Sequence, residues 1–148
     1  MKTLIVYFTH GGTTDRMADV IADGLRRNGL TVDTCDIVEG TPPGLDGYDS
    51  LGVGFPVYVF RPPFIIINYL ESLPDLKDIP VFTFTTHGTY QGDAGNRARK
   101  TLKSRGGREI GHLNTRGEDH YLGHPKLGYL FSPNRPDENQ IDQAKSAW

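Results

Sequence analysis

The feature that most constrains the fold of this chain is an alternation of short apolar runs with helix-like segments. Strands that alternate with helices favour a parallel sheet with right-handed crossovers. We therefore expect an α/β fold, a doubly wound five-stranded parallel sheet with helices on both faces. The apolar runs cover residues 4–8, 30–38, 50–55, 79–85 and 108–113, and the helix-like segments cover residues 17–25, 64–73 and 93–105.

The 148 residues suit a single domain that spans positions 1–148. Residues 30–38 alternate apolar and polar side chains, which predicts a strand near the edge of the sheet. Residues 114–135 are rich in Gly, His, Tyr and Pro without a sustained period, and we expect a long irregular loop there. Pro136 and two acidic residues after it predict a short final helix over residues 136–148.

Bulk composition argues against several classes of partner. The net charge of −2 comes with no basic stripe, so we expect no nucleic acid. No apolar run approaches the roughly 18 residues that span a bilayer, and Lys2 leads directly into a strand rather than a signal peptide. Cys35 is the only cysteine, which excludes an internal disulfide or iron–sulfur cluster and favours a cytoplasmic setting.

A polar loop follows the first apolar run and introduces the first helix. Its glycines, hydroxyl groups and helix N-terminus are typical of a phosphate site, although an ordinary helix cap would use similar residues. The loop consists of Thr9, His10, Gly11, Gly12, Thr13 and Thr14.

Two further loops should meet this one, because ligands of doubly wound sheets bind beyond the carboxyl ends of the strands. Both offer aromatic rings and backbone amides, which suit a planar heterocycle. Together the three loops predict a flat ligand that carries a phosphate. The second loop contains Pro56, Val57, Tyr58 and Val59, and the third contains Thr86, His87, Gly88, Tyr90 and Gly92.

The pattern resembles the flavodoxin-like family, whose first loop reads roughly Ser/Thr-x-Thr-Gly-x-Thr and holds the phosphate of flavin mononucleotide (FMN). Thr9, Gly12, Thr13 and Thr14 fit that loop, whereas Gly11 stands where the family usually has a threonine. The resemblance implies that FMN is the cofactor and that the second and third loops flank its isoalloxazine ring, with Tyr58 or Tyr90 against the ring.

More narrowly, the runs GFPVY, THG and NTRGEDHYLGHPKLGYLFSPNRPDE resemble the flavodoxin-type half of two-domain flavodoxin–ferredoxin proteins of anaerobes. Those proteins carry cysteine-rich cluster motifs after this region, so an iron–sulfur cluster would here belong to another molecule or segment. The resemblance implies an electron-transfer protein, monomeric or weakly dimeric, whose redox partner is a ferredoxin-like protein or a reductase.

Two other functions remain open. One is an NAD(P)H-dependent quinone or flavin reductase, and the other is a binding module that has lost flavin. Nucleotide triphosphatases and dinucleotide-binding enzymes are disfavoured, because neither G-x-x-x-x-G-K-[ST] nor G-x-G-x-x-G occurs. His112, His120 and His124 suggest no metal site, since Gly123 and Pro125 oppose a helix that would bring them together.

Two details of the loops bear on how a flavin would be held. His10 and His87 either contact the phosphate or the reducing edge of the flavin, or cap surface loops. There is no glycine between Pro56 and Arg61, so positive φ at Val57, Tyr58 or Val59 would cost about 1–2 kcal/mol. The resemblance implies that a glycine in this loop would let a peptide flip so that its carbonyl accepts a hydrogen bond from N5–H of the half-reduced flavin. Without that glycine we expect the half-reduced flavin to be weakly stabilised.

Overall fold

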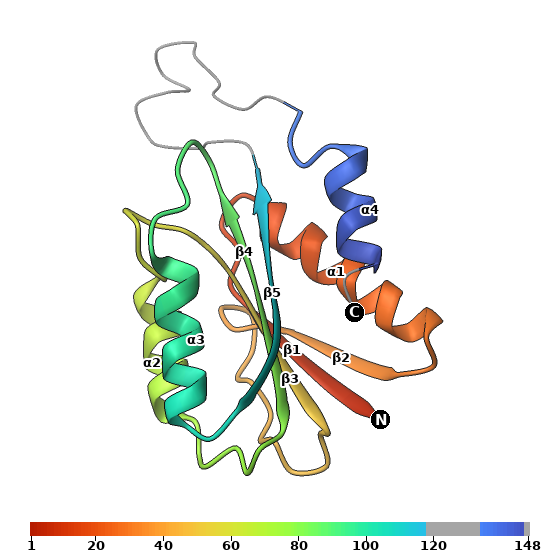
Figure 1. Cartoon of the computed structure of the whole chain (residues 1–148), viewed down its shortest axis with the longest axis vertical. Coiled ribbons are helices and arrows are strands. Elements are labelled where there is room, and N and C mark those ends of the chain that lie inside the picture. The colour runs from red at the N-terminus through yellow and green to blue at the C-terminus, as the bar shows by residue number, and fades with distance from the viewer. Residues whose placement is uncertain (118–133, 147–148) are drawn as a thin grey trace.

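Strands and helices alternate through the chain, as the sequence predicts. A computed structural model describes residues 1–117 and 134–146 (Figure 1). The strands are β1 (Lys2–Tyr7), β2 (Thr31–Asp36), β3 (Ser50–Pro56), β4 (Pro80–His87) and β5 (Arg108–Arg116). The helices are α1 (Thr13–Arg27), α2 (Phe64–Ser72), α3 (Ala94–Ser104) and α4 (Glu138–Ser146).

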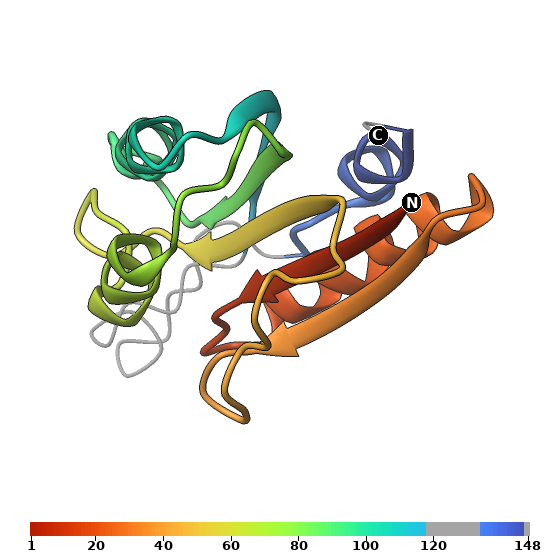
Figure 2. The same ribbon diagram turned by 90° about the horizontal axis from the view of Figure 1, so that it is seen from below.

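All five strands pair in parallel, in the order β2-β1-β3-β4-β5. This arrangement confirms the predicted doubly wound sheet, and β2 lies at an edge, as its alternating pattern predicts. In Figure 2 the sheet separates two layers, with α1 and α4 on one face and α2 and α3 on the other. The expected helices on both faces are therefore confirmed.

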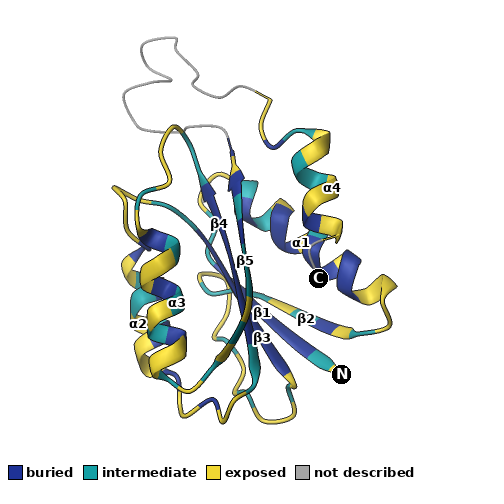
Figure 3. Cartoon of the chain, in the orientation of Figure 1, coloured by how far each residue is buried: buried dark blue, intermediate teal, exposed yellow. Residues whose placement is uncertain are grey.

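The apolar run of β1 is continuous because both of its faces are covered. Leu4 and Val6 join the core under α2 and α3, while Ile5 and Tyr7 join the core under α1. Figure 3 shows the sheet as the most buried part of the molecule, with the exposed residues on the outer sides of the helices.

Glycines in β3 make room for aromatic rings of the neighbouring strand. A Cβ at Gly52 would lie 2.3 Å from the ring of Phe82, and one at Gly54 would lie 2.0 Å from the ring of Phe84. Both distances are far below van der Waals contact, so β3 tolerates only glycine at these positions. The short glycine-containing strand therefore follows from packing across the sheet.

The structure corrects the predicted boundaries near the carboxyl terminus. Residues 114–116 belong to β5 rather than to the expected irregular loop, because they continue the pairing with β4. Asn114 also accepts a hydrogen bond from Thr85 at 2.9 Å. The rest of the predicted loop, apart from residues 117, 134 and 135, lies outside the described residues.

Helix α4 begins two residues later than predicted, because Asp137 and Gln140 form a reciprocal cap. The amide of Gln140 donates to the Asp137 carboxylate at 3.0 Å, and the amide of Asp137 donates to the Gln140 side chain at 3.1 Å. The helix packs closely on α1, where a Cβ at Gly24 would lie 2.8 Å from the carbonyl oxygen of Lys145.

Candidate functional site

The first of the three predicted loops connects the carboxyl end of β1 to the N-terminus of α1. Gly12 has a φ of 81° in the left-handed region, and no side chain within the described residues caps the helix. The Thr9 hydroxyl instead accepts a hydrogen bond from the amide of Gly12 at 3.1 Å. The first amides of a helix have no acceptor within it, so this turn presents donors with a positive dipole end.

His10, Gly11 and Gly12 are exposed in this loop, whereas Thr14 is 1% exposed. The Thr14 hydroxyl shares a hydrogen bond of 2.8 Å with the Thr86 hydroxyl at the end of β4. Thr86 is also buried, so this bond ties the start of α1 to the third loop. The sequence analysis predicts a phosphate contact at Thr14. In the structure its hydroxyl bonds to Thr86, and the phosphate contact stays a prediction.

Tyr7 and Asp15 add a contact that the sequence analysis missed. The Tyr7 hydroxyl donates to the Asp15 carboxylate at 2.5 Å, at the first turn of α1. Burial, together with this carboxylate, raises the pKa of Tyr7 far above its usual value, so the phenol stays protonated and remains a donor. An acidic residue in the first turn was visible in the sequence, but its partner on β1 was not.

The second loop forms a two-residue hairpin. The backbones of Tyr58 and Arg61 exchange two hydrogen bonds of 2.9 Å each, and Val59 and Phe60 between them have φ values of 45° and 66°. Such a turn requires positive φ at both central positions and therefore favours Asn-Gly. The structure thus contains the left-handed conformation at Val59 that the sequence analysis judged costly, and the strain is part of the fold.

Aromatic rings join the second loop to the third loop and to Phe8, the residue directly before the first loop. Tyr58 meets Phe8 edge to face with ring centroids 5.9 Å apart, and Phe60 meets Tyr90 in the same way at 5.4 Å. Gly92 lies so close that a Cβ there would be 2.6 Å from the Cα of Phe60. The predicted convergence of the three loops is confirmed by these contacts.

The second and third loops are also joined through the backbone. The amide of Val57, directly after Pro56, donates to the carbonyl of Thr86 at 2.8 Å. Tyr58 and Tyr90 are 41% and 69% exposed, so both keep open ring surface beside the convergence. Their expected position against a flavin ring stays a prediction, as do the roles of the other loop residues.

His10 is exposed in the first loop, whereas His87 lies in partly buried surroundings at the end of β4. His87 ends β4, is partly buried, and places Nδ1 3.1 Å from the carbonyl oxygen of Gly88. Burial lowers the pKa of His87, the Gly88 carbonyl partly offsets this, and Arg116 lowers the pKa further. A neutral imidazole is therefore expected at His87 near neutral pH, so this ring supplies a hydrogen bond and no cationic charge.

A fourth segment reaches the same region and was not foreseen. Gly117, just after β5, donates its amide to the carbonyl of His87 at 2.8 Å, and a Cβ there would lie 2.7 Å from the Thr13 side chain. Gln91 of the third loop accepts a hydrogen bond from Asn114 of β5. The sequence analysis missed this segment because it ended the fifth strand at residue 113, three residues before the observed end of β5.

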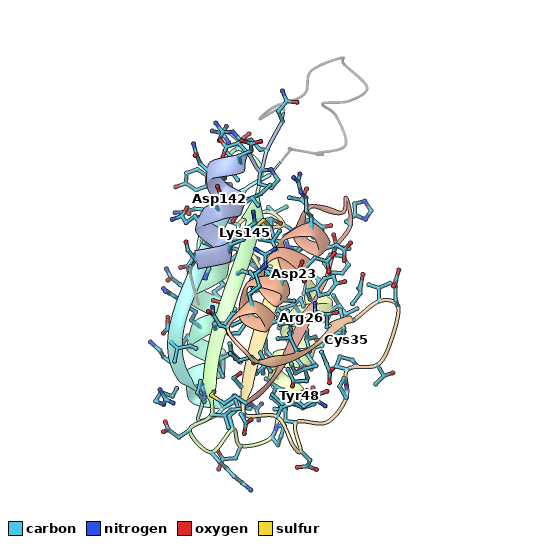
Figure 4. The ribbon with its side chains drawn as sticks, turned by 90° about the vertical axis from the view of Figure 1, so that its right-hand side faces the viewer. Asp23, Arg26, Cys35, Tyr48, Asp142 and Lys145 are labelled. Atoms are coloured by element: carbon cyan, nitrogen blue, oxygen red, sulfur yellow. The ribbon has the colours of Figure 1, made fainter. Side chains whose placement is uncertain are left out.

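Neither a metal cluster nor a membrane-spanning helix is found in the part of the chain that the structure describes. In residues 1–117 and 134–146, no three His, Cys, Asp or Glu side chains are grouped as a metal site; His120 and His124 lie outside these ranges. Over the same ranges no helix has the length and apolar character needed to cross a membrane. Burial raises the pKa of the Cys35 thiol on the edge strand β2 (Figure 4), which disfavours the reactive thiolate.

Comparison with known proteins identifies the same architecture. The model of the flavodoxin domain family matches residues 4–121. No sequence among curated proteins matches the chain.

Solved structures with this fold include flavodoxins. A flavodoxin from the domain Archaea superposes with a TM-score of 0.75 at 14% identity, covering 98% of this chain and 92% of the other. The two-electron reduced flavodoxin of Megasphaera elsdenii gives 0.70 at 18% identity and 99% coverage of both chains. Rubredoxin:oxygen oxidoreductase of the anaerobe Desulfovibrio gigas gives 0.74 at 17% identity, with 97% of this chain matching 33% of that one.

Proposed function

The chain belongs to the flavodoxin domain family, whose model matches most of its length, and on this premise we propose that it binds FMN noncovalently and exchanges electrons with a redox partner. FMN supplies the one- and two-electron chemistry, and the protein binds it, orients it and limits its contact with water.

The observation that carries the proposal is the open N-terminus of α1 between two aromatic loops. Gly12 replaces a side-chain cap, and nothing lies within 4 Å of the place where its Cβ would be, so the first-turn amides are accessible to an anion. Tyr58 and Tyr90 offer exposed ring surface next to that turn. A phosphate and a planar ring on one ligand match this arrangement.

Individual residues then have separate roles. We assign phosphate binding to the backbone amide and the hydroxyl of Thr13 in the first turn of α1, and a supporting role to Thr14 through its bond to Thr86. His10 is exposed beside this turn, and we assign it a contact with the same anion. The missing hydroxyl at Gly11 leaves room there for water or for the His10 side chain.

The partner in this proposal is an iron–sulfur protein. The resemblance to the flavodoxin-type half of two-domain flavodoxin–ferredoxin proteins supports it, and the single cysteine requires that the cluster be held by another molecule or segment. Electrons would then pass between the exposed edge of the flavin and the cluster of that partner.

Binding tests the first step of the proposal. We expect FMN to be taken up with quenching of its fluorescence, and riboflavin, which lacks the phosphate, to bind at least about tenfold more weakly. Equal affinity for both ligands, or no uptake of either, would contradict the phosphate role of α1.

A matched pair of variants locates the phosphate. His10→Glu places a carboxylate beside the turn and should weaken FMN while leaving riboflavin unchanged, because only FMN carries the repelled charge. Ile110→Glu introduces the same charge at a position that is 48% exposed near the amino end of β5, at the opposite end of the strands from the loop, and should leave both affinities unchanged. A parallel loss of FMN and riboflavin in His10→Glu would indicate damage to the loop rather than repulsion.

The reductase alternative is separated by a single mixing experiment. An electron carrier keeps its flavin oxidised when NADH or NADPH is added alone, and it is reduced only by a redox protein or a chemical reductant. Rapid bleaching of the flavin absorbance by either nucleotide would replace the carrier with an NAD(P)H-dependent reductase.

A further inference from the structure

The first turn of helix α2 is apolar on all sides but is only partly covered. Its first four residues are Phe64, Ile65, Ile66 and Ile67, of which only Ile66 is fully buried. Phe64 is 82% exposed. A helix that is hydrophobic all round is normally buried, so part of its surface lacks the cover its composition calls for.

The neighbouring hairpin extends this apolar surface. Val59 and Phe60 are 78% and 52% exposed, and with Phe64 they form what we call the apolar rim. Five of the eight exposed large apolar residues within the described ranges lie here, namely these three with Tyr58 and Tyr90. Concentrations of this kind mark interaction sites, whereas single exposed apolar side chains need no explanation.

The apolar rim borders a groove between α2 and α3 with a volume of about 1390 Å³. Phe8, Leu70 and Ala98 contribute apolar lining beneath it. Phe8 also packs against Tyr58, so the groove runs up to the proposed flavin site. A protein seated in the groove would thus stand next to the cofactor.

The charges around the groove are mostly positive. Arg61, Arg97 and Lys100 line it, against Asp93 and Glu71. Arg97 pairs with Asp93 at 3.5 Å, but both side chains are more than half exposed, so water and salt weaken this pair. No ion pair of Arg61 or Lys100 occurs among the described residues.

Helix α3 strengthens this local field. Its sequence AGNRARKTLKS has four basic residues and no acidic one. Arg99 and Lys103 pair with Glu109 of β5 and do not line the groove, which leaves Arg97 and Lys100 for that side. Three basic and two acidic side chains therefore give the groove a net charge of +1, on a chain whose net charge is −2.

We propose that the apolar rim and the cationic groove between α2 and α3 form the docking surface for an acidic electron-transfer protein, whose carboxylates surround an apolar centre. This inference rests on the proposed function and adds the polarity of the partner. Complementary charge steers association and fixes orientation, while the apolar rim supplies buried area at the centre. Phe64 and Val59 protrude into solvent, which suits a protein face better than a small molecule.

A binding experiment tests this without electron transfer. The FMN-loaded protein is titrated by calorimetry with a small acidic two-cluster ferredoxin and, in parallel, with cytochrome c, a basic electron-transfer protein. We expect the ferredoxin to bind more tightly, and its affinity to fall as salt rises. Absence of ferredoxin binding, or preference for cytochrome c, would overturn the proposal.

Paired variants test the charges. Arg97→Glu/Lys100→Glu should weaken ferredoxin binding at least about tenfold and should strengthen binding of cytochrome c. Arg27→Glu/Lys145→Glu makes the same charge change on the opposite layer, where Lys145 of α4 lies (Figure 4), and should change ferredoxin affinity less than about twofold. Equal effects of the two pairs would show that only net charge matters, and would refute the surface.

Phe64→Ser tests the apolar rim, because this exposed side chain can be removed without disturbing the core. We expect ferredoxin binding to weaken roughly tenfold, with no change for Ile110→Ser, which removes a 48% exposed residue on β5. Unchanged binding in Phe64→Ser would refute the role of the rim.

The affinity of each variant for FMN separates the two proposals. Failure of the parent protein to bind FMN refutes the proposed function, whereas normal FMN binding with charge variants that dock normally refutes only the docking surface. NADPH that competes with ferredoxin for the groove would also refute it, and would assign the groove to a nucleotide.

Discussion

The strained hairpin of the second loop leads to a prediction that can be worked through from the structure. Val59 has a φ of 45°, and left-handed backbone costs L-residues about 1–2 kcal/mol, with β-branched residues worst. Asparagine tolerates this conformation and is preferred at the first central position of such a turn. Val59→Asn should therefore relieve most of the strain.

The substitution sacrifices little burial of the Val59 side chain. Val59 is 78% exposed, so its burial contributes roughly a fifth of the about 1.5–3 kcal/mol of a fully buried valine. The net expectation is a gain of about 1 kcal/mol in the free energy of unfolding. Phe60→Gly relieves similar strain, but it removes a half-buried ring and its edge contact with Tyr90, worth roughly 0.5–1.5 kcal/mol, so no net gain is expected there.

Equilibrium unfolding in urea without added FMN measures the effect. With a slope of about 1–3 kcal/mol/M, Val59→Asn should raise the midpoint by roughly 0.3–1 M. Val38→Asn is the control, because Val38 is 61% exposed and its φ is not positive, and it should stay within about 0.5 kcal/mol of the parent. Equal or lower stability of Val59→Asn, with an unchanged slope, would refute the strain argument.

Two further measurements test the packing of the loops and the titration of the core. Gly92→Ala should destabilise the protein by at least about 1 kcal/mol more than Gly12→Ala in urea, because both have positive φ but only Gly92 lies against the Phe60 backbone; equal losses would contradict this. Burial, followed by nearby cationic charge, lowers the pKa of His112, so the unfolded chain binds a proton that the folded chain does not, and stability should fall as the pH drops below about 6.5. His112→Gln should show a smaller loss of melting temperature between about pH 7.5 and 5.5 than the exposed-site control His10→Gln, and an identical loss would show that His112 is not responsible.

Much of the fold was predictable because it follows from local patterns. The apolar run of β1 reports burial on both faces, the alternation in β2 reports an edge, and Pro and Gly separate the elements. The parallel sheet and its crossovers followed from general rules of chirality rather than from any one residue, whereas the order of the strands came only from the structure. The three loops of the candidate site were found because parallel strands end at one edge of the sheet.

Contacts across the sheet were not predictable in this way. The bond between Thr14 and Thr86, the Tyr7 hydroxyl on Asp15, and the position of Gly117 each join residues far apart in sequence or on different elements. Strand β5 was ended early because its last residues are polar, and only pairing with β4 keeps them in the sheet.

The sequence by itself determined the layers of the sheet and the residues of its three loops, because periodicity and turn chemistry are local properties. Only the tertiary structure decided the left-handed turn at Val59 and Phe60 and the groove between α2 and α3. Both depend on how elements pack: Phe8, Tyr90 and Gly92 contact the turn from other segments, and the spacing of two helices leaves apolar side chains uncovered. Such features carry no signal in any single segment, and here they lie beside the proposed cofactor site.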